Sequence, residues 1–178
     1  MINRAIFLDR DGTLNLSYLK DFKTVPPKSL DEVMILDGVT EGLEILKKLK
    51  FILVVITNQP DYIRGSASLK NIVEINSQIC AMLKIKYAYV CLHDNEDKCP
   101  CRKPGNGFLL QASKDLGINL SESYLIGDRL SDVQAGIDSG CTSFLIENDA
   151  NAVAKSYIGV PSMIEAVKLI SERELSNG

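Results

Sequence analysis

The sequence lacks several features that would assign it to a class at once. It contains no tryptophan and only one histidine, and it has no run of about 18 apolar residues, the length that spans a membrane. Its first residues, MINRAIFLDRD, include too short an apolar run for a signal peptide and no small-residue cleavage site. A net charge of −3 argues against a protein that coats nucleic acid. We therefore expect a cytoplasmic protein with neither a membrane nor a nucleic acid as its partner.

What the sequence does contain is a regular alternation of apolar runs and helical patterns. The apolar runs lie at residues 5–8, 52–56, 87–91, 124–126 and 143–146, and the helical patterns lie at 39–50, 69–83, 107–116, 131–139 and 162–172. Strands that alternate with helices of this length form a parallel sheet covered on both faces. The sequence thus predicts an α/β fold, a Rossmann-like three-layer sandwich, in one domain over residues 1–178. Only the tail, residues 174–178, is expected to fray.

Polar side chains gather at the ends of three predicted strands. They stand in the segments DRDGT (residues 9–13), TNQ (57–59) and GDRLSD (127–132). In an open parallel sheet, ligands bind beyond the carboxyl ends of the strands, so these segments are expected at one edge of the sheet. Asp9 and Asp11 stand two residues apart and would repel one another unless a positive charge lies beside them. The pattern predicts a cation, a strained loop or both at this edge.

Together with RKP at residues 102–104, these segments resemble the four ordered motifs of the haloacid-dehalogenase superfamily of phosphatases. The similarity runs from residue 5 to about residue 146, and the motifs agree in order, spacing and strand placement. Within the superfamily, DRDGTLN, TNQP…RG and the CxH…CxCRKP pattern resemble the branch that contains heptose bisphosphate phosphatases and histidinol phosphatases.

The resemblance implies a magnesium-dependent hydrolase of phosphate monoesters. Asp9 would attack phosphorus and form an aspartyl-phosphate, and Asp11 would protonate the leaving oxygen and later activate a water molecule. Mg²⁺ would bind the Asp9 carboxylate, the backbone carbonyl of Asp11 and the Asp128 carboxylate, and would relieve the repulsion between the carboxylates. Asp132 has two open interpretations: it orients the metal site, or it only caps the helix that follows.

The same resemblance places further polar residues at the substrate. The Thr57 hydroxyl and the Asn58 backbone N–H would bind phosphoryl oxygens, and Lys103 would neutralise the charge that develops in the transition state. The family's heptose enzymes carry lysine where this chain has Arg129, whereas histidinol phosphatases carry arginine, so the contacts to the distal part of the substrate stay open. The other side chains expected at the substrate are Gln59, Arg64 and, as forked donors, Arg102 and Arg129.

A second pattern lies in CLHDNEDKCPC, residues 91–101. Cys91, His93, Cys99 and Cys101 form a C-x-H-x5-C-x-C array, in which two close pairs of ligands can close a tetrahedral Zn²⁺ site that leaves no open position. A disulfide is the alternative, but a cytoplasmic chain disfavours one. We expect a structural zinc ion that stiffens the loop carrying the RKP segment.

The spacing of the motifs bears on the substrate. The stretches between residues 11 and 57 and between 57 and 103 are filled by predicted strands and helices, so the enzyme should be capless. Its pocket would be walled by loops at residues 16–28 and 60–68 and by the zinc-binding loop. The favoured hypothesis is a monomer that removes the 7-phosphate of D-glycero-D-manno-heptose 1,7-bisphosphate in heptose nucleotide-sugar biosynthesis. Histidinol phosphate and other small sugar or polyol phosphates are the alternatives.

Other reaction classes are excluded by missing motifs. No cysteine is followed six residues later by arginine, as a cysteine-dependent phosphatase requires. A phosphohistidine mechanism needs a free histidine, and the single histidine belongs to the metal array. No GxxxxGK[ST] loop occurs, which excludes a P-loop nucleoside triphosphatase. A zinc-containing binding module on an inactive phosphatase fold is the non-enzymatic alternative, and the intact Asp9 and Asp11 argue against it.

Overall fold

The computed structural model describes residues 3–20, 22–147 and 156–176. Its centre is a parallel sheet of six strands in the order β5-β4-β1-β6-β7-β8. The strands are β1 (Ala5–Leu8), β4 (Ile52–Asn58), β5 (Tyr87–Cys91), β6 (Tyr124–Gly127), β7 (Thr142–Ile146) and β8 (Ile158–Val160). The five predicted strands are confirmed, and β8 is an additional short strand at the edge of the sheet.

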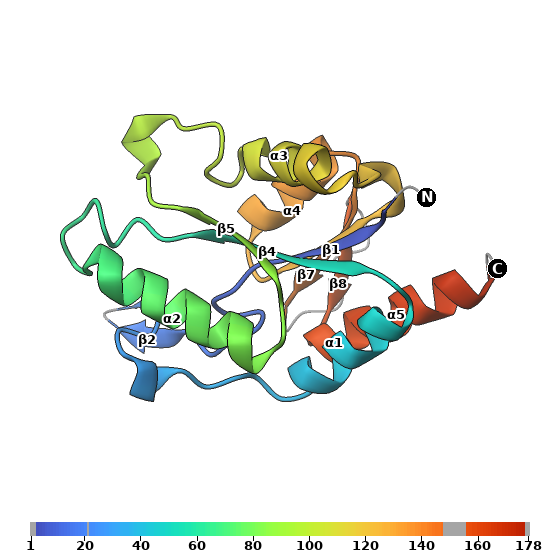
Figure 1. Ribbon diagram of the computed structural model, residues 1–178, viewed down its shortest axis with the longest axis horizontal. Coiled ribbons are helices and arrows are strands. Elements are labelled where there is room, and N and C mark those ends of the chain that lie inside the picture. The colour runs from blue at the N-terminus through green and yellow to red at the C-terminus, as the bar shows by residue number, and fades with distance from the viewer. Residues whose placement is uncertain (1–2, 21, 148–155, 177–178) are drawn as a thin grey trace.

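Helices cover both faces of this sheet (Figure 1), which confirms the three-layer α/β sandwich. Helices α1 (Val39–Lys48), α2 (Leu69–Met82) and α5 (Met163–Ser176) pack on one face. Helices α3 (Gly107–Leu116) and α4 (Leu130–Asp138) pack on the other. No helix among the described residues is long and apolar enough to cross a membrane.

Strand β1 shows why a central strand reads as an unbroken apolar run. Ile6 and Leu8 point into the hydrophobic cluster beneath α1, α2 and α5, whereas Ala5 and Phe7 point into the cluster beneath α3 and α4. All four side chains are fully buried, because successive residues of a strand face opposite sides and both sides are covered here.

The end of α5 corrects one expectation. The helix continues to Ser176, and the Glu174 carboxylate pairs with Arg4 and accepts a hydrogen bond from the Tyr124 hydroxyl at 3.0 Å. The predicted fraying from residue 174 is therefore wrong, and residues 177–178 lie outside the described chain. These contacts fasten α5 to the residue that precedes β1 and to the first residue of β6.

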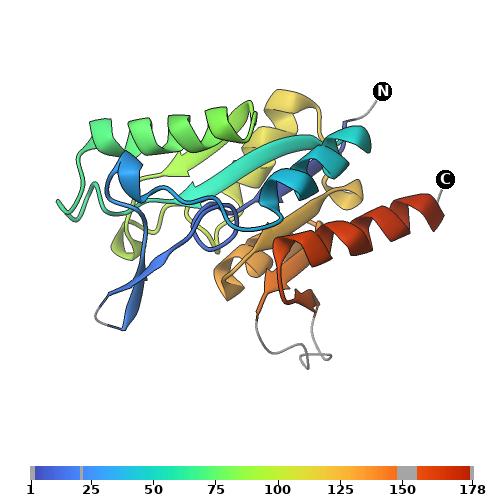
Figure 2. The ribbon, with the colours of Figure 1, turned by 90° about the horizontal axis from the view of Figure 1, so that it is seen from below.

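The segment expected as a loop at residues 16–28 contains an antiparallel hairpin, β2 (Tyr18–Lys20) and β3 (Lys23–Val25), which projects from the body of the protein in Figure 2. Thr24 on this hairpin accepts a hydrogen bond from Arg129 at 3.1 Å. The stretches before and after β4 contain no inserted cap domain in the described part of the chain, as predicted. The hairpin stands in place of a simple loop as one wall of the pocket described next.

Candidate active site

The polar segments of the sequence meet where the three adjacent strands β4, β1 and β6 end. A pocket of about 340 Å³ opens there. The structure thus places at one edge of the sheet the residues that the motifs singled out. Those lining the pocket include Asp9, Asp11, Thr57, Asn58, Lys103 and Arg129.

Lys103 lies at the centre of the charged groups. Its Nζ is 2.5 Å from Asp9 Oδ1 and 2.6 Å from Asp132 Oδ1, and it donates to the carbonyl oxygen of Ile56 at 2.7 Å. Burial alone would lower the pKa of Lys103, but the charges of Asp132 and Asp9 outweigh burial and raise it. The lysine therefore stays cationic beside the predicted nucleophile.

The carboxylates around Lys103 are crowded and poorly hydrated. Burial raises the pKa of Asp9 to about 7; Lys103 opposes this shift, and Asp132 and Asp128 add to it. Burial, followed by the charge of Asp132, raises the pKa of Asp128 to about 6. Lys103 and, at 3.9 Å from Asp128, Arg129 are the positive groups beside these three carboxylates, so additional positive charge would stabilise their ionised forms.

This cluster fits a divalent cation. Asp9, Asp128 and Asp132 each offer an oxygen, and these oxygens lie within 4.8 Å of one another. Asp128 Oδ1 is buried and has no hydrogen-bond partner within the described residues. Gly12 allows the backbone to pass close by, because a Cβ there would lie 2.2 Å from Asp128 Oδ2 and the residue has φ of +89°. Hard oxygen ligands of this kind suit Mg²⁺.

Asp132 caps the helix that follows, one of the two interpretations that the sequence left open, and it also binds Lys103; a role in orienting a metal ion stays a prediction. Its Oδ2 accepts a hydrogen bond from the backbone N–H of Arg129 at 2.9 Å, which caps the start of α4. Its Oδ1 binds Lys103 at 2.6 Å. One carboxylate thus fixes both the helix and the lysine.

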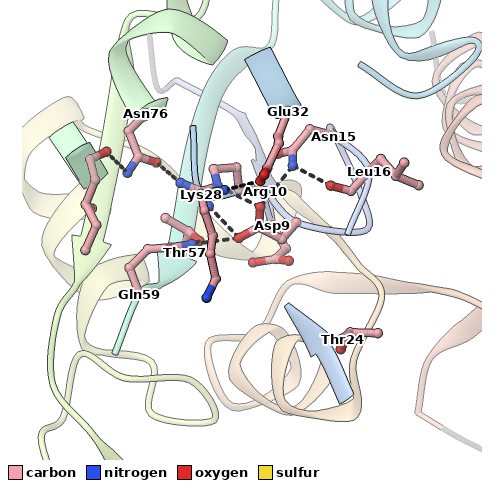
Figure 3. A network of polar contacts seen from close by, with 12 residues as sticks. Asp9, Arg10, Asn15, Leu16, Thr24, Lys28, Glu32, Thr57, Gln59 and Asn76 are labelled. Atoms are coloured by element: carbon pink, nitrogen blue, oxygen red, sulfur yellow. Dashed lines mark hydrogen bonds and ion pairs between the residues drawn. The ribbon is translucent and has the colours of Figure 1, made fainter. Parts of the chain in front are cut away.

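Asp11 is held by four donors (Figure 3). Arg10 Nε and Asn15 Nδ2 each lie 3.0 Å from Oδ1, and Arg10 Nη2 and Gln59 Nε2 each lie 2.7 Å from Oδ2. The expectation that a metal ion relieves the repulsion at Asp11 needs correction, because the positive charge against its carboxylate is Arg10. Arg10, the middle residue of the DRD segment, turns into the protein and is 1% exposed.

The three residues that end β4 have different surroundings. Thr57 lines the pocket. Asn58 also lines it, and its side chain makes two hydrogen bonds with the backbone of Lys103, one to the carbonyl at 3.0 Å and one from the N–H at 3.1 Å. Gln59 departs from the expectation of a substrate contact: it is 2% exposed, and its amide donates to Asp11 and Thr57 because it points into the protein.

The three arginines expected at the substrate all line the pocket. Arg64 forms two contacts of 2.5 Å with Asp94, from Nε and from Nη2. Arg102 donates to Asn95 Oδ1 at 2.8 Å and to the carbonyl of His93 at 3.0 Å. Two of the three are thus tied to the loop after β5, whereas Arg129 is tied to the hairpin.

The predicted zinc ligands come together at the end of β5. Cys91, His93, Cys99 and Cys101 each place one ligand atom within 4.8 Å of the others. The Sγ atoms of Cys101 and Cys91 lie 3.5 Å apart, His93 Nδ1 lies 3.6 Å from Cys91 Sγ, and the Sγ atoms of Cys99 and Cys101 lie 2.6 Å apart. The cysteines are free thiols, which is the form that can bind zinc.

Sequence reasoning missed four residues that shape the site: Arg10, Asn15, Asn76 and Asp94. The first two follow from the DRDGTLN motif only once side-chain directions are known. Asn76 did leave a signal, since it is a polar residue on the apolar face of α2, in register with Ile72 and Ile79. Asp94 is a surface aspartate whose pairing with Arg64 joins segments that are 30 residues apart.

Comparison with known proteins identifies related chains. Residues 100–160 match a family model described as HAD-hydrolase-like. The chain is 32% identical to a D-glycero-β-D-manno-heptose-1,7-bisphosphate 7-phosphatase of Haemophilus influenzae, covering 94% of this chain and all of that protein. It is 34% identical to the protein of the same name from Helicobacter pylori, covering 94% of this chain and 98% of that one.

Solved structures show the same fold. A D,D-heptose 1,7-bisphosphate phosphatase from B. bronchiseptica, complexed with magnesium and phosphate, superposes with a TM-score of 0.82 at 23% identity, covering 96% of this chain and 99% of that one. A putative HAD-like phosphatase from Mesorhizobium loti gives 0.78 at 25% identity, covering 97% of this chain and 88% of that one. With this fold, these relatives and an intact acidic site, the chain belongs to the haloacid-dehalogenase-like phosphatases, in the family of the heptose bisphosphate 7-phosphatases.

Proposed function

We propose that this phosphatase removes the 7-phosphate of D-glycero-D-manno-heptose 1,7-bisphosphate, with Asp9 as nucleophile and Mg²⁺ as cofactor. The observation that carries the proposal is the position of Asp9, which lies in the pocket in contact with the buried cation Lys103 and beside Asp128 and Asp132. A phosphate dianion placed there meets positive charge next to an oxygen that can attack it. The substrate is suggested by the names of relatives that match nearly the full chain.

The residues that would hold Mg²⁺ are Asp9 and Asp128, through their carboxylates, and Asp11 through its backbone carbonyl. When bound, the ion supplies positive charge that offsets the repulsion between these carboxylates and an incoming phosphate. Asp128 Oδ1 is buried and without a hydrogen bond within the described residues, with Arg129 Nε 3.9 Å away, and Gly12 lets the backbone approach Asp128 closely; both features support this ligand set.

In the first half of the reaction, an Asp9 oxygen forms a bond to phosphorus while the bond from phosphorus to the sugar oxygen breaks. The sugar oxygen takes a proton from Asp11, so a neutral alcohol leaves. In the second half, a water molecule gives its proton to Asp11 as its oxygen attacks phosphorus, the Asp9–phosphorus bond breaks, and inorganic phosphate is released. Both aspartates return to their starting states.

Three groups bind the phosphoryl oxygens in this proposal: the Thr57 hydroxyl, the Asn58 backbone N–H and Lys103 Nζ. Lys103 contacts Asp9 already in the resting structure, so no reorganisation is needed to bring its charge to the reacting phosphate. Gln59 supports the same site from inside, because its side chain fixes both Thr57 and Asp11.

We assign the second phosphate of the substrate to the arginines at the wall of the pocket. Arg102 and Arg129 both line the pocket, and Arg64 adds a third positive charge. The nucleophile lies at the base of this pocket, so a phosphate on a primary carbon can reach it while the phosphate held against the ring stays at the arginines. The expected product is therefore the heptose 1-phosphate.

We further propose that Cys91, His93, Cys99 and Cys101 bind one structural Zn²⁺. Cys99 and Cys101, which lie just before the RKP segment, would then anchor Arg102. None of these four residues lines the substrate pocket, and four protein ligands leave no open position on the metal. Both points support a structural role.

The test is a screen of phosphorylated sugars and polyols, including the heptose bisphosphate and histidinol phosphate, with purified protein and Mg²⁺. Phosphorus NMR of the product identifies which phosphate is lost. Release of the primary phosphate is the expected result, and loss of the anomeric phosphate signal would overturn the regiochemistry. Preference for histidinol phosphate would identify that ester as the substrate in place of the heptose bisphosphate. Failure to hydrolyse any ester would favour a binding module.

A further inference from the structure

A buried polar chain connects helix α2 to the Asp11 carboxylate. Asn76 Oδ1 accepts a hydrogen bond from Arg10 Nη1 at 3.0 Å, and Asn76 Nδ2 donates to the carbonyl of Ile72 at 2.8 Å. Arg10 in turn binds both oxygens of Asp11. Figure 3 shows Asn76 of helix α2 beside Arg10, with a dashed line between them. Asn76 and Arg10 are not among the residues that line the catalytic pocket.

The guanidinium of Arg10 is divided between these two partners. Its Nε and Nη2 face Asp11, and its Nη1 faces Asn76. A buried guanidinium must have its N–H groups satisfied, and the side-on pairing of Nε and Nη2 with a carboxylate requires the planar fork to face that carboxylate edge-on. Asn76 holds the far side of the fork, so it determines the orientation of the near side.

We propose that Asn76 is a positioning residue for the reaction: through Arg10 it fixes the Asp11 carboxylate where the leaving oxygen takes its proton. This inference rests on the proposed function, in which Asp11 is the acid and base. Asn15 and Gln59 restrain the same carboxylate from other directions, but only Arg10 contacts both of its oxygens. Loss of Asn76 therefore leaves Asp11 present and less well aligned.

The test compares two leaving groups. A sugar oxygen needs a proton as it departs, whereas 4-nitrophenolate leaves without one, and kcat/KM reports on this first half of the reaction. We expect Asn76→Leu to lower kcat/KM for the best alkyl phosphate of the screen about tenfold more than for 4-nitrophenyl phosphate. Arg10→Lys keeps a cation but loses the fork, and should give the same pattern; it keeps the test decisive if Asn76→Leu does not fold.

The matched control is Ile75→Val on the same helix. It loosens the packing of a buried side chain and leaves the Asn76–Arg10 bond in place, so both substrates should be affected equally. Calorimetry of Mg²⁺ binding gives a readout other than activity: Asn76 contacts neither Asp9 nor Asp128, so the Kd should stay within about twofold. An equal loss for both substrates in Asn76→Leu and Arg10→Lys, or no loss, would overturn the inference. Wild-type protein that hydrolyses neither ester would overturn the proposed function instead.

Discussion

Asn58 and Lys103 bind each other through two hydrogen bonds that run in opposite directions, side-chain amide to carbonyl and backbone N–H to side-chain oxygen. The pair fastens the segment after the cysteine cluster to the end of β4, and Lys103 Nζ makes a further bond to Ile56 on the same strand. The position of Lys103 is therefore set mainly by the sheet. The position of its neighbour Arg102 is set by the loop after β5.

Replacing the nucleophile should abolish activity and spare the fold. In Asp9→Asn the amide cannot attack phosphorus, while Lys103 keeps its ion pair with Asp132. We expect kcat to fall by several orders of magnitude, each factor of ten corresponding to about 1.4 kcal/mol of barrier. Steady-state kinetics measures the loss, and Asp31→Asn, at an exposed position in the short 3-10 helix Leu30–Glu32, is the control. More than a few per cent of the wild-type rate would contradict the assignment of Asp9.

Purified protein should contain close to one zinc ion per chain. Cys99→Ser should lose the metal, lower the melting temperature and raise KM more than it lowers kcat, because Arg102 depends on this loop more than Lys103 does. Elemental analysis and thermal melting measure these effects. Cys80→Ser, in α2 and outside the cluster, should retain the zinc. A zinc-free preparation under reducing conditions would refute the structural role.

Arg102 should discriminate between substrates. Arg102→Ala should lower kcat/KM for the heptose bisphosphate at least about tenfold more than for 4-nitrophenyl phosphate, which has no second phosphate to bind. Lys114→Ala removes an exposed positive charge from α3 and should change neither value. Equal losses for the two substrates would place the second phosphate elsewhere.

The contacts of Glu174 at the end of α5 should make a measurable contribution to the free energy of unfolding. Glu174→Gln removes the ion pair with Arg4 and weakens the bond from Tyr124, so the free energy of unfolding should fall by about 1 kcal/mol. Urea denaturation provides the measurement. Glu172→Gln, at an exposed position on the same helix, should change it little, and equal effects of the two substitutions would show that the ion pair does not contribute.

Tyr124 should make stability depend on alkaline pH. Burial, and then its hydrogen bond to Glu174, raises the pKa of Tyr124 from 10.0 to about 12. Because the folded pKa lies above the unfolded one, the contribution is complete below the unfolded pKa and is lost as pH rises from 10 towards 12. The unfolding free energy of wild type relative to Tyr124→Phe should therefore fall between about pH 10 and about pH 12. A pH-independent difference would contradict this pKa.

The sequence predicts the inner part of the fold well because a strand buried on both faces must be apolar throughout. It does not predict β8, which is only three residues long, or the β2–β3 hairpin, whose strands pair with each other and carry mostly exposed side chains. Phe22, just before β3, has φ of +59°, a conformation that its residue type does not signal.

In the candidate active site, too, one part can be predicted from the sequence and another cannot. The motifs predict which residues meet at the edge of the sheet, because backbone position follows from strand order. They do not predict where side chains turn: Arg10 and Gln59 point inward to Asp11, and Arg64 pairs with Asp94. Rotamers depend on partners from distant segments, such as Asn76, which lies 66 residues from Arg10.

Strand β5 lies at one edge of the sheet, whereas β1, β4 and β6 are each paired on both sides. The strands that carry the proposed nucleophile and phosphate-binding groups are thus interior, and the strand that leads into the cysteine cluster and Arg102 is peripheral. Edge amides open to solvent with a smaller free energy than central ones, so hydrogen exchange should reach β5 before β4, β1 and β6. On heating, the protein should lose its discrimination among phosphate esters before it loses the capacity to hydrolyse them.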